Sequence, residues 1–239
     1  MNRLLNITAV ILTTFFCLFI TSCKKVTPAA VLAGNYSLSE QFDSISEMQT
    51  QGWVFINNSR ALGTATWEQG DPTIFTAYTS DYTAADYVCV DAQCAYPFDS
   101  LGNFTPNTTV SAWMLTPVLH VKNGDQLNFY TSSTYEPPVI PDRLEVRVNP
   151  TGGSSADVGS DSSSVGAFTQ IVLDINPNLL VDGYPNQWTE YQFTVSGFPT
   201  LTATRFAFRY YKPIYTLGYA SYYYDLGYIG IDDFNFVSN

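Results

Sequence analysis

Positive charge is scarce in this 239-residue chain. Lysine and arginine together number 10, against 21 aspartate and glutamate residues, which gives a formal net charge of −11 at pH 7. A surface this acidic is not expected to bind nucleic acid or to dock on anionic membranes, because both carry negative charge themselves. The acidic balance favours solubility and the binding of cations.

Histidine is almost absent, which limits the chemistry available to the chain. His120 is the single histidine, so a Ser-His-Asp triad would have to use it, and the sequence contains no Gly-x-Ser-x-Gly nucleophile motif. One histidine also leaves too few ligands for the usual zinc sites. Only Asp232 and Asp233 stand out as the kind of carboxylate pair that glycoside hydrolysis needs. We therefore predict that the protein is not an enzyme.

Cysteine is rare, with four residues in the chain. Cys17 and Cys23 belong to the N-terminal region, so Cys89 and Cys94 are left for the folded domain. Two thiols without a nearby histidine do not complete a metal site, and their four-residue spacing is not that of a Cys-x-x-Cys redox motif. In an oxidising compartment, we expect Cys89 and Cys94 to form a local disulfide.

Long apolar runs are missing except at the N-terminus. Leu4 to Ile20 follows a short positive stretch and precedes Thr21, Ser22 and Cys23, which is the pattern of a secretory signal. The cysteine after small residues resembles a bacterial lipobox, a resemblance that implies cleavage before Cys23 and lipidation of its thiol. An uncleaved membrane anchor is the alternative, since about 17 apolar residues lie near the lower limit for a span.

These features divide the chain into three parts. We predict a lipoprotein signal over residues 1–22, a small and polar tether over residues 23–37, and one large β domain over residues 38–239. The protein is then a bacterial membrane lipoprotein that faces the periplasm or the cell surface. Its contact with the bilayer is through the N-terminal lipid only.

Helical periodicity is absent from every long stretch, with one turn at most over Glu47 to Gln51. Alternating aromatic and β-branched residues between turn signals predict an all-β fold instead. Ser111 to Val121 has apolar residues on both parities, which predicts an interior strand, and Pro117 should mark its end. Asn123-Gly124-Asp125 supplies a turn before the next strand.

Three other segments are predicted from charge and turn residues. Arg143 to Val148 alternates regularly, with its apolar residues facing the core and its charges facing outward. Asp81 to Thr109, which holds both cysteines of the domain, is polar and is predicted as a long loop. Thr151 to Gly166 is rich in glycine, serine and aspartate and is predicted as a mobile loop.

Eight short motifs are spread over residues 38–237. They are Phe42-Asp43, Gly52-Trp53, Trp67, Trp113-Met114-Leu115-Thr116-Pro117, Leu127-Asn128-Phe129, Trp188, Phe208-Arg209 and Ile231-Asp232-Asp233-Phe234. In this order the chain resembles the choice-of-anchor J domain, close kin of the cleaved adhesin domain. The resemblance implies a jelly-roll β-sandwich of two antiparallel sheets, related to MAM domains and carbohydrate-binding modules. It also implies a non-catalytic, extracytoplasmic and often adhesive module that calcium often stabilises.

The parity of the core residues changes along the last strand. Ile229 and Ile231 share one side, whereas Phe234 and Phe236 share the other, so we predict a β-bulge between the pairs. A carboxylate turned inward there would need a partner, and a cation with oxygen ligands would supply it. The resemblance places the first strand beside the last, so we predict a structural calcium ion held by Asp232, Asp233, Asp43 and Glu40. The alternative is that Asp232 accepts backbone or tyrosine hydrogen bonds without a metal.

Tyrosine is dense between residues 210 and 228. On a loop, a tyrosine ring offers a flat apolar face with a hydroxyl, which suits a sugar or a protein partner. We predict that Tyr222, Tyr223 and Tyr224 bind the ligand. The predicted function is a lipid-anchored binding or adhesion module for a glycan or a surface protein. The alternatives are an accessory subunit of a cell-surface assembly and a hydrolase.

Overall fold

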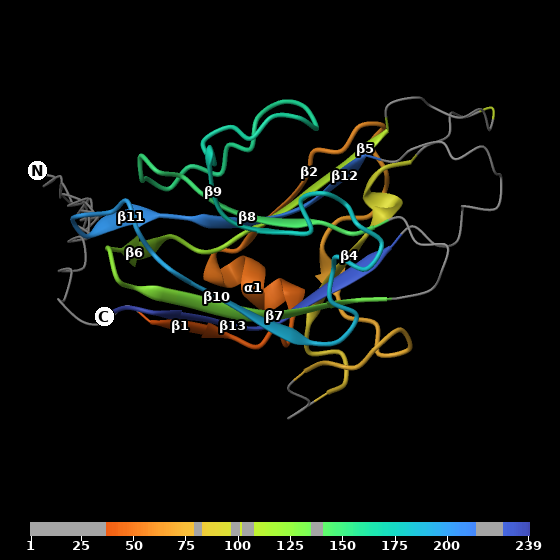
Figure 1. Ribbon diagram of the computed structural model, residues 1–239, viewed down its shortest axis with the longest axis horizontal. Coiled ribbons are helices and arrows are strands. Elements are labelled where there is room, and N and C mark those ends of the chain that lie inside the picture. The colour runs from red at the N-terminus through yellow and green to blue at the C-terminus, as the bar shows by residue number, and fades with distance from the viewer. Residues whose placement is uncertain (1–36, 79–82, 97–100, 102–107, 135–140, 214–226) are drawn as a thin grey trace, which may run out of the picture. The chain divides into compact units, whose positions relative to one another are not determined.

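The computed structural model describes residues 37–78, 83–96, 101, 108–134, 141–213 and 227–239. Within these ranges two antiparallel β-sheets form two layers with the core between them (Figure 1). This confirms the predicted all-β sandwich. The predicted lipidation site Cys23 and the predicted ligand residues Tyr222, Tyr223 and Tyr224 lie outside the described residues.

The first layer, here called the six-stranded sheet, has the order β10-β7-β13-β4-β3, with β1 paired to β13 as well. Its first strand therefore lies against its last, as the resemblance to the choice-of-anchor J domain implied. The strands are β1 (Leu38–Glu40), β3 (Glu68–Gln69), β4 (Val88–Asp91), β7 (Gln126–Ser133), β10 (Thr189–Thr194) and β13 (Tyr228–Val237).

The second layer, here called the five-stranded sheet, has the order β2-β5-β12-β8-β9. Two shorter strands, β6 and β11, pair with each other. The bounds are β2 (Val54–Asn57), β5 (Thr109–Leu115), β8 (Leu144–Val148), β9 (Gln170–Ile175), β12 (Phe206–Pro213), β6 (Leu119–Val121) and β11 (Thr202–Thr204).

Aromatic side chains fill the space between the two sheets. The ring of Phe208 on β12 lies edge-on to Phe129 on β7, with 5.0 Å between centroids, and edge-on to Phe234 on β13 at 6.0 Å. Trp53 also packs edge-on against Phe234, at 5.4 Å. All four side chains are buried, so the hydrophobic contact across the layers is what holds the sandwich closed.

The Trp113 strand is interior, as its apolar residues on both parities indicated. β5 lies between β2 and β12, with Met114 in the core and Trp113 in a separate cluster on the outer face. The strand ends at Leu115, two residues before Pro117, since proline cannot donate to a ladder.

The bulge predicted in the last strand is present. The register between β13 and β7 shifts between Asp232 and Asn235, and Asp233 takes the left-handed conformation with φ 48°. Ile231 before the shift and Phe234 after it both reach the core. The bulge therefore reconciles the two parities within one strand.

One helix is longer than the sequence analysis expected. Helix α1 spans Ile45–Gln51, about two turns rather than one. The Ser44 hydroxyl accepts a hydrogen bond from the Glu47 backbone N–H, and Gly52 ends the helix at φ 99°, so both ends are capped. Met48 is its buried residue. In the described part of the chain, no helix has the length and apolar character that a membrane span needs.

The prediction of one long loop over Asp81 to Thr109 is wrong in its middle. Val88–Asp91 forms β4, which pairs with β13 on one side and β3 on the other. Val88 and Val90 are fully buried in the core. A four-residue strand inside polar flanks is too short to show a clear period, and the pairing with β13 decides its conformation.

The segment Thr151–Gly166, predicted as a mobile loop, packs on the outer face of the five-stranded sheet. Val158 is buried there in one cluster with Trp113 and Leu115, and Phe168 just after the segment joins them. This loop also covers the charges of β8, so Glu145 and Arg147 are buried instead of facing solvent. The apolar residues of Arg143 to Val148 face the core, as predicted. The charged residues point to the outer face, but the loop shields that face from solvent.

Candidate binding cleft

The four carboxylates predicted to hold calcium are not gathered around one point. Glu40 is buried and accepts a hydrogen bond from the Phe42 backbone N–H at 3.0 Å, and burial raises its pKa. Asp43 is exposed. Among the described residues, no three histidine, cysteine or acidic side chains are placed to hold a metal ion. As they stand, these side chains do not fit a calcium ion.

Asp232 and Asp233 are bonded to protein groups instead. Asp232 is buried, and its carboxylate accepts hydrogen bonds from the backbone N–H groups of Tyr78 and Asp233, both at 2.7 Å. Asp233 accepts from the side chains of Gln41 at 2.8 Å and Asn235 at 3.0 Å. The bonds to Asp232 match the alternative given above, in which this carboxylate accepts backbone hydrogen bonds without a metal ion.

The calcium ion therefore stays a prediction from the sequence, and thermal unfolding tests it. If the ion binds the native state only, millimolar calcium should raise the melting temperature above its value in EDTA, through mass action. Asp232→Ala should abolish that rise. Equal melting curves of the wild-type domain in EDTA and in calcium would contradict the prediction.

The disulfide predicted between Cys89 and Cys94 is not formed in this structure, where both residues are buried free thiols. They lie in different clusters: Cys89 packs with Tyr87 and Tyr228 on the outer side of β4, whereas Cys94 belongs to the core between the sheets. The Cys89 thiol donates to the Gln69 carbonyl at 3.2 Å, and burial raises its pKa to about 12. Burial raises the pKa of Cys94 as well.

His120 is the single histidine of the chain. It lies half-buried on β6 opposite Ala203 and lines a groove of about 380 Å³ with neighbours that include Leu38, Pro117 and Leu119.

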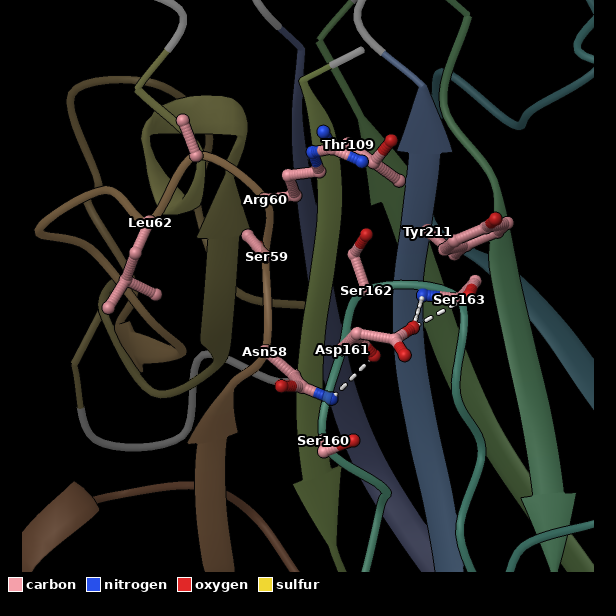
Figure 2. Close-up of a pocket in the computed structure, with 11 residues that line it drawn as sticks. Asn58, Ser59, Arg60, Leu62, Thr109, Ser160, Asp161, Ser162, Ser163 and Tyr211 are labelled. Atoms are coloured by element: carbon pink, nitrogen blue, oxygen red, sulfur yellow. Dashed lines mark hydrogen bonds between the residues drawn. The ribbon is translucent and has the colours of Figure 1, made fainter. Parts of the chain in front are cut away.

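A larger cleft, of about 760 Å³, opens beside β12 on the outer side of the five-stranded sheet. Figure 2 shows the segment after β2 on one side of it, Tyr211 on the other, and the loop around Asp161 crossing between them. Its lining residues are Asn58, Ser59, Arg60, Ala61, Leu62, Thr109, Ser160, Asp161, Ser162, Ser163 and Tyr211.

Hydrogen bonds hold the walls of this cleft in place. The Asn58 side chain donates to the Asp161 carbonyl at 2.8 Å, which ties the β2 segment to the loop. Asp161 in turn accepts from the Ser163 hydroxyl and backbone N–H and from the Ser164 N–H. These bonds lower the pKa of Asp161 to about 2. At neutral pH, Asp161 is therefore an ionised acceptor inside a loop of defined shape.

Arg209 fixes Tyr211, the aromatic side chain among the described lining residues of the cleft. The Arg209 guanidinium carbon lies 3.8 Å from the centroid of the Tyr211 ring and 4.8 Å from that of Trp113. Its nitrogens donate to the Ser111 hydroxyl at 3.1 Å and to the Ser162 carbonyl at 2.5 Å. One buried cation thus joins an aromatic ring to the loop that faces it.

A cluster of buried charges underlies the cleft. The Glu145 carboxylate binds Arg147 at 2.6 Å, Arg143 at 2.9 Å and Arg209 at 3.2 Å, and Asp174 binds Arg143 at 2.7 Å. Burial raises the pKa of Glu145, but the three guanidinium groups outweigh burial and hold it below its ordinary value. Sequence reasoning missed this cluster because it took the outer face of β8 to be in water.

The cleft offers an aromatic ring, hydroxyls, an amide, one guanidinium and one carboxylate. Such a mixture of donors and acceptors around an aromatic side chain suits a ligand with many hydroxyl groups. Asp161 contributes a carboxylate among the described lining residues and is bonded within its own loop. These groups are arranged to accept a polar ligand in the cleft.

Comparisons with known proteins bear on the fold. No protein-family model matches this chain, and no curated protein matches it in sequence. The K2 cleaved adhesin domain of Lys-gingipain is similar in structure, with 15% identity, 84% of this chain and 98% of that chain covered, and a TM-score of 0.50. The K1 domain, from Porphyromonas gingivalis W83, has 18% identity, coverage of 85% and 98%, and a TM-score of 0.49. The chain is thus similar to a cleaved adhesin domain in its β-sandwich fold.

Proposed function

We propose that this protein is a lipid-anchored, extracytoplasmic binding module that takes a glycan into the cleft beside Tyr211. The observation that carries the proposal is the Tyr211 ring, held by the buried Arg209 at the edge of a cleft lined with hydroxyl, amide and carboxylate groups. A fixed ring can stack on the apolar face of a sugar, while the polar groups bind its hydroxyls. Because one fold serves many functions, the proposal depends on this cleft more than on the likeness to an adhesin.

The size and charge of the site favour a neutral glycan. A volume of about 760 Å³ lies within the range of small-molecule sites, about 300–1,000 Å³. The net charge of −11 repels polyanions at long range. The walls are already hydrogen-bonded in the unbound protein, so ligand binding should cost little conformational entropy of the loops.

Removing the ring tests the proposal. Tyr211→Ala should weaken binding of a neutral oligosaccharide by at least about tenfold, since loss of an aromatic anchor usually removes more than 1.4 kcal/mol of binding energy. A neutral-glycan array would identify the probe, and titration calorimetry would measure its affinity for both proteins.

Tyr78→Ala is the matched control, because Tyr78 is 43% exposed and stacks on Tyr130 of the six-stranded sheet. It should keep wild-type affinity. Equal losses in both variants would contradict the assignment of the cleft. A folded wild-type protein that binds no glycan on the array would favour the accessory-subunit alternative.

The location follows from the N-terminal sequence and has its own test. Two or more lipid chains on Cys23 would anchor the protein stably, at about 0.8 kcal/mol per buried methylene group. Cys23→Ser should therefore release the protein from membranes or block its processing, as fractionation would show. Palmitate labelling that persists in Cys23→Ser would contradict the assignment of Cys23 as the lipidation site.

A further inference from the structure

A lysine and an aspartate lie together in the interior of the sandwich, away from the cleft. The Lys212 ammonium nitrogen is 2.7 Å from one carboxylate oxygen of Asp142, and the two side chains are 0% and 2% exposed. Tyr210 on β12 pairs with Leu144 on β8, so Lys212 and Asp142 lie two residues further along the same two neighbouring chain segments. Full burial is rare for lysine.

The surroundings bring further groups to this pair. The Tyr210 hydroxyl donates to the same Asp142 oxygen at 2.6 Å, and Lys212 lies 5.1 Å from the Tyr210 ring centroid. A side chain at Gly227 would place its first carbon 2.3 Å from that oxygen and 2.4 Å from the Lys212 nitrogen, so only glycine leaves room. Burial raises the pKa of Asp91, and the Lys212 charge opposes that rise.

We propose that Lys212 and Asp142 react with each other to form an isopeptide bond inside the folded protein. The Lys212 nitrogen bonds to the side-chain carbonyl carbon of Asp142, and the second carboxylate oxygen leaves as water. The ammonium group and the carboxylate together supply both hydrogens and the oxygen of that water, so no co-reactant is needed. The product is one neutral amide.

The buried site favours the neutral product, because one amide replaces two buried charges. The attacking group is the neutral amine of Lys212, and the protons that its ammonium form loses leave with the departing oxygen as water. The fold holds the two groups in contact, which replaces a bimolecular encounter by an intramolecular one. The Tyr210 hydroxyl is placed to stabilise the oxyanion that forms on Asp142.

Intact-mass spectrometry of the folded full chain, denatured immediately before measurement, tests the bond. Processing at Cys23 changes the mass of every variant alike, so masses are compared between variants. After allowance for the substitution itself, the wild-type mass should lie one water below the masses of Lys212→Arg and Asp142→Ala, and proteolysis of the wild type alone should release two peptides joined through Lys212 and Asp142. Lys122→Arg, which changes a lysine in the turn before β7, should keep the link.

The rate of formation tests the assisting hydroxyl. Tyr210→Phe, which removes only the hydroxyl, should slow appearance of the linked species by about 100-fold after synthesis. A link formed at the wild-type rate in this variant would overturn the role of the hydroxyl. A wild-type chain that shows no loss of water relative to the two variants, and no joined peptides, would overturn the proposal, whether or not the variants fold.

Discussion

Replacing Glu145 by glutamine is expected to destabilise the fold by about 3–5 kcal/mol, because it leaves buried arginines without their shared carboxylate. Arg209 and Arg147 both bind Glu145, and their side chains are 2% and 10% exposed. Because glutamine has nearly the same shape as glutamate, the loss in free energy of unfolding comes from the missing charge more than from a change in packing. Urea unfolding of the two proteins measures it, as a lower midpoint with an unchanged slope.

The matched control is Glu190→Gln, which changes an exposed glutamate on β10 whose partner is the Asn128 side chain. Its effect should stay within about 0.5 kcal/mol. Equal effects of the two changes would show that Glu145 does not hold the cluster together.

The stabilisation from Glu145 should also depend on pH. The pKa of Glu145 in the folded protein is lower than in the unfolded chain, where a glutamate has a pKa of about 4.3. A group with a lowered folded pKa contributes fully above its unfolded pKa, and its contribution is lost as the pH falls through the folded value. The difference in stability between wild type and Glu145→Gln should therefore be constant near neutral pH and shrink below about pH 4.

Phe208→Ala should be about as damaging, with an expected loss of about 3–5 kcal/mol. The Phe208 ring is fully buried and contacts Phe129 and Phe234 of the opposite sheet. Removing it opens a cavity where the two layers meet, since close-packed neighbours relax only in part. Thermal or urea unfolding would measure the loss.

Leu180→Ala gives the comparison, because Leu180 is 62% exposed and its backbone hydrogen bonds with Asn176 do not use the side chain. It should change stability by less than about 0.5 kcal/mol. If Phe208→Ala were equally mild, contact between the sheets at this position would not be what stabilises the sandwich.

Local pattern predicted most of the sheet structure correctly. The two parities of the Trp113 strand and the parity change between Ile231 and Phe234 are both confirmed. Each of these patterns reflects one rule: side chains in a strand alternate between two faces, and large apolar side chains face a core. A rule of this kind depends on near neighbours alone, so it can be read without the fold.

Local pattern failed where long-range packing decided the outcome. β4 is a strand because β13 and β3 pair with it, and Thr151–Gly166 is an ordered cover because Trp113 offers it an apolar face. Cys89 and Cys94 are near in sequence, but the sheet places them in separate clusters. None of these partners is adjacent in the chain.

The sequence by itself therefore determined the all-β class, the strands whose alternation is regular, and the bulge that the last strand requires, while the resemblance to a known family implied the sandwich. The tertiary structure alone brought Tyr211 and Asp161 to one cleft, gathered three arginines on Glu145, and placed Lys212 against Asp142. The physical reason is that burial and electrostatic contact depend on which segments meet in space, whereas strand periodicity depends on the backbone's own geometry.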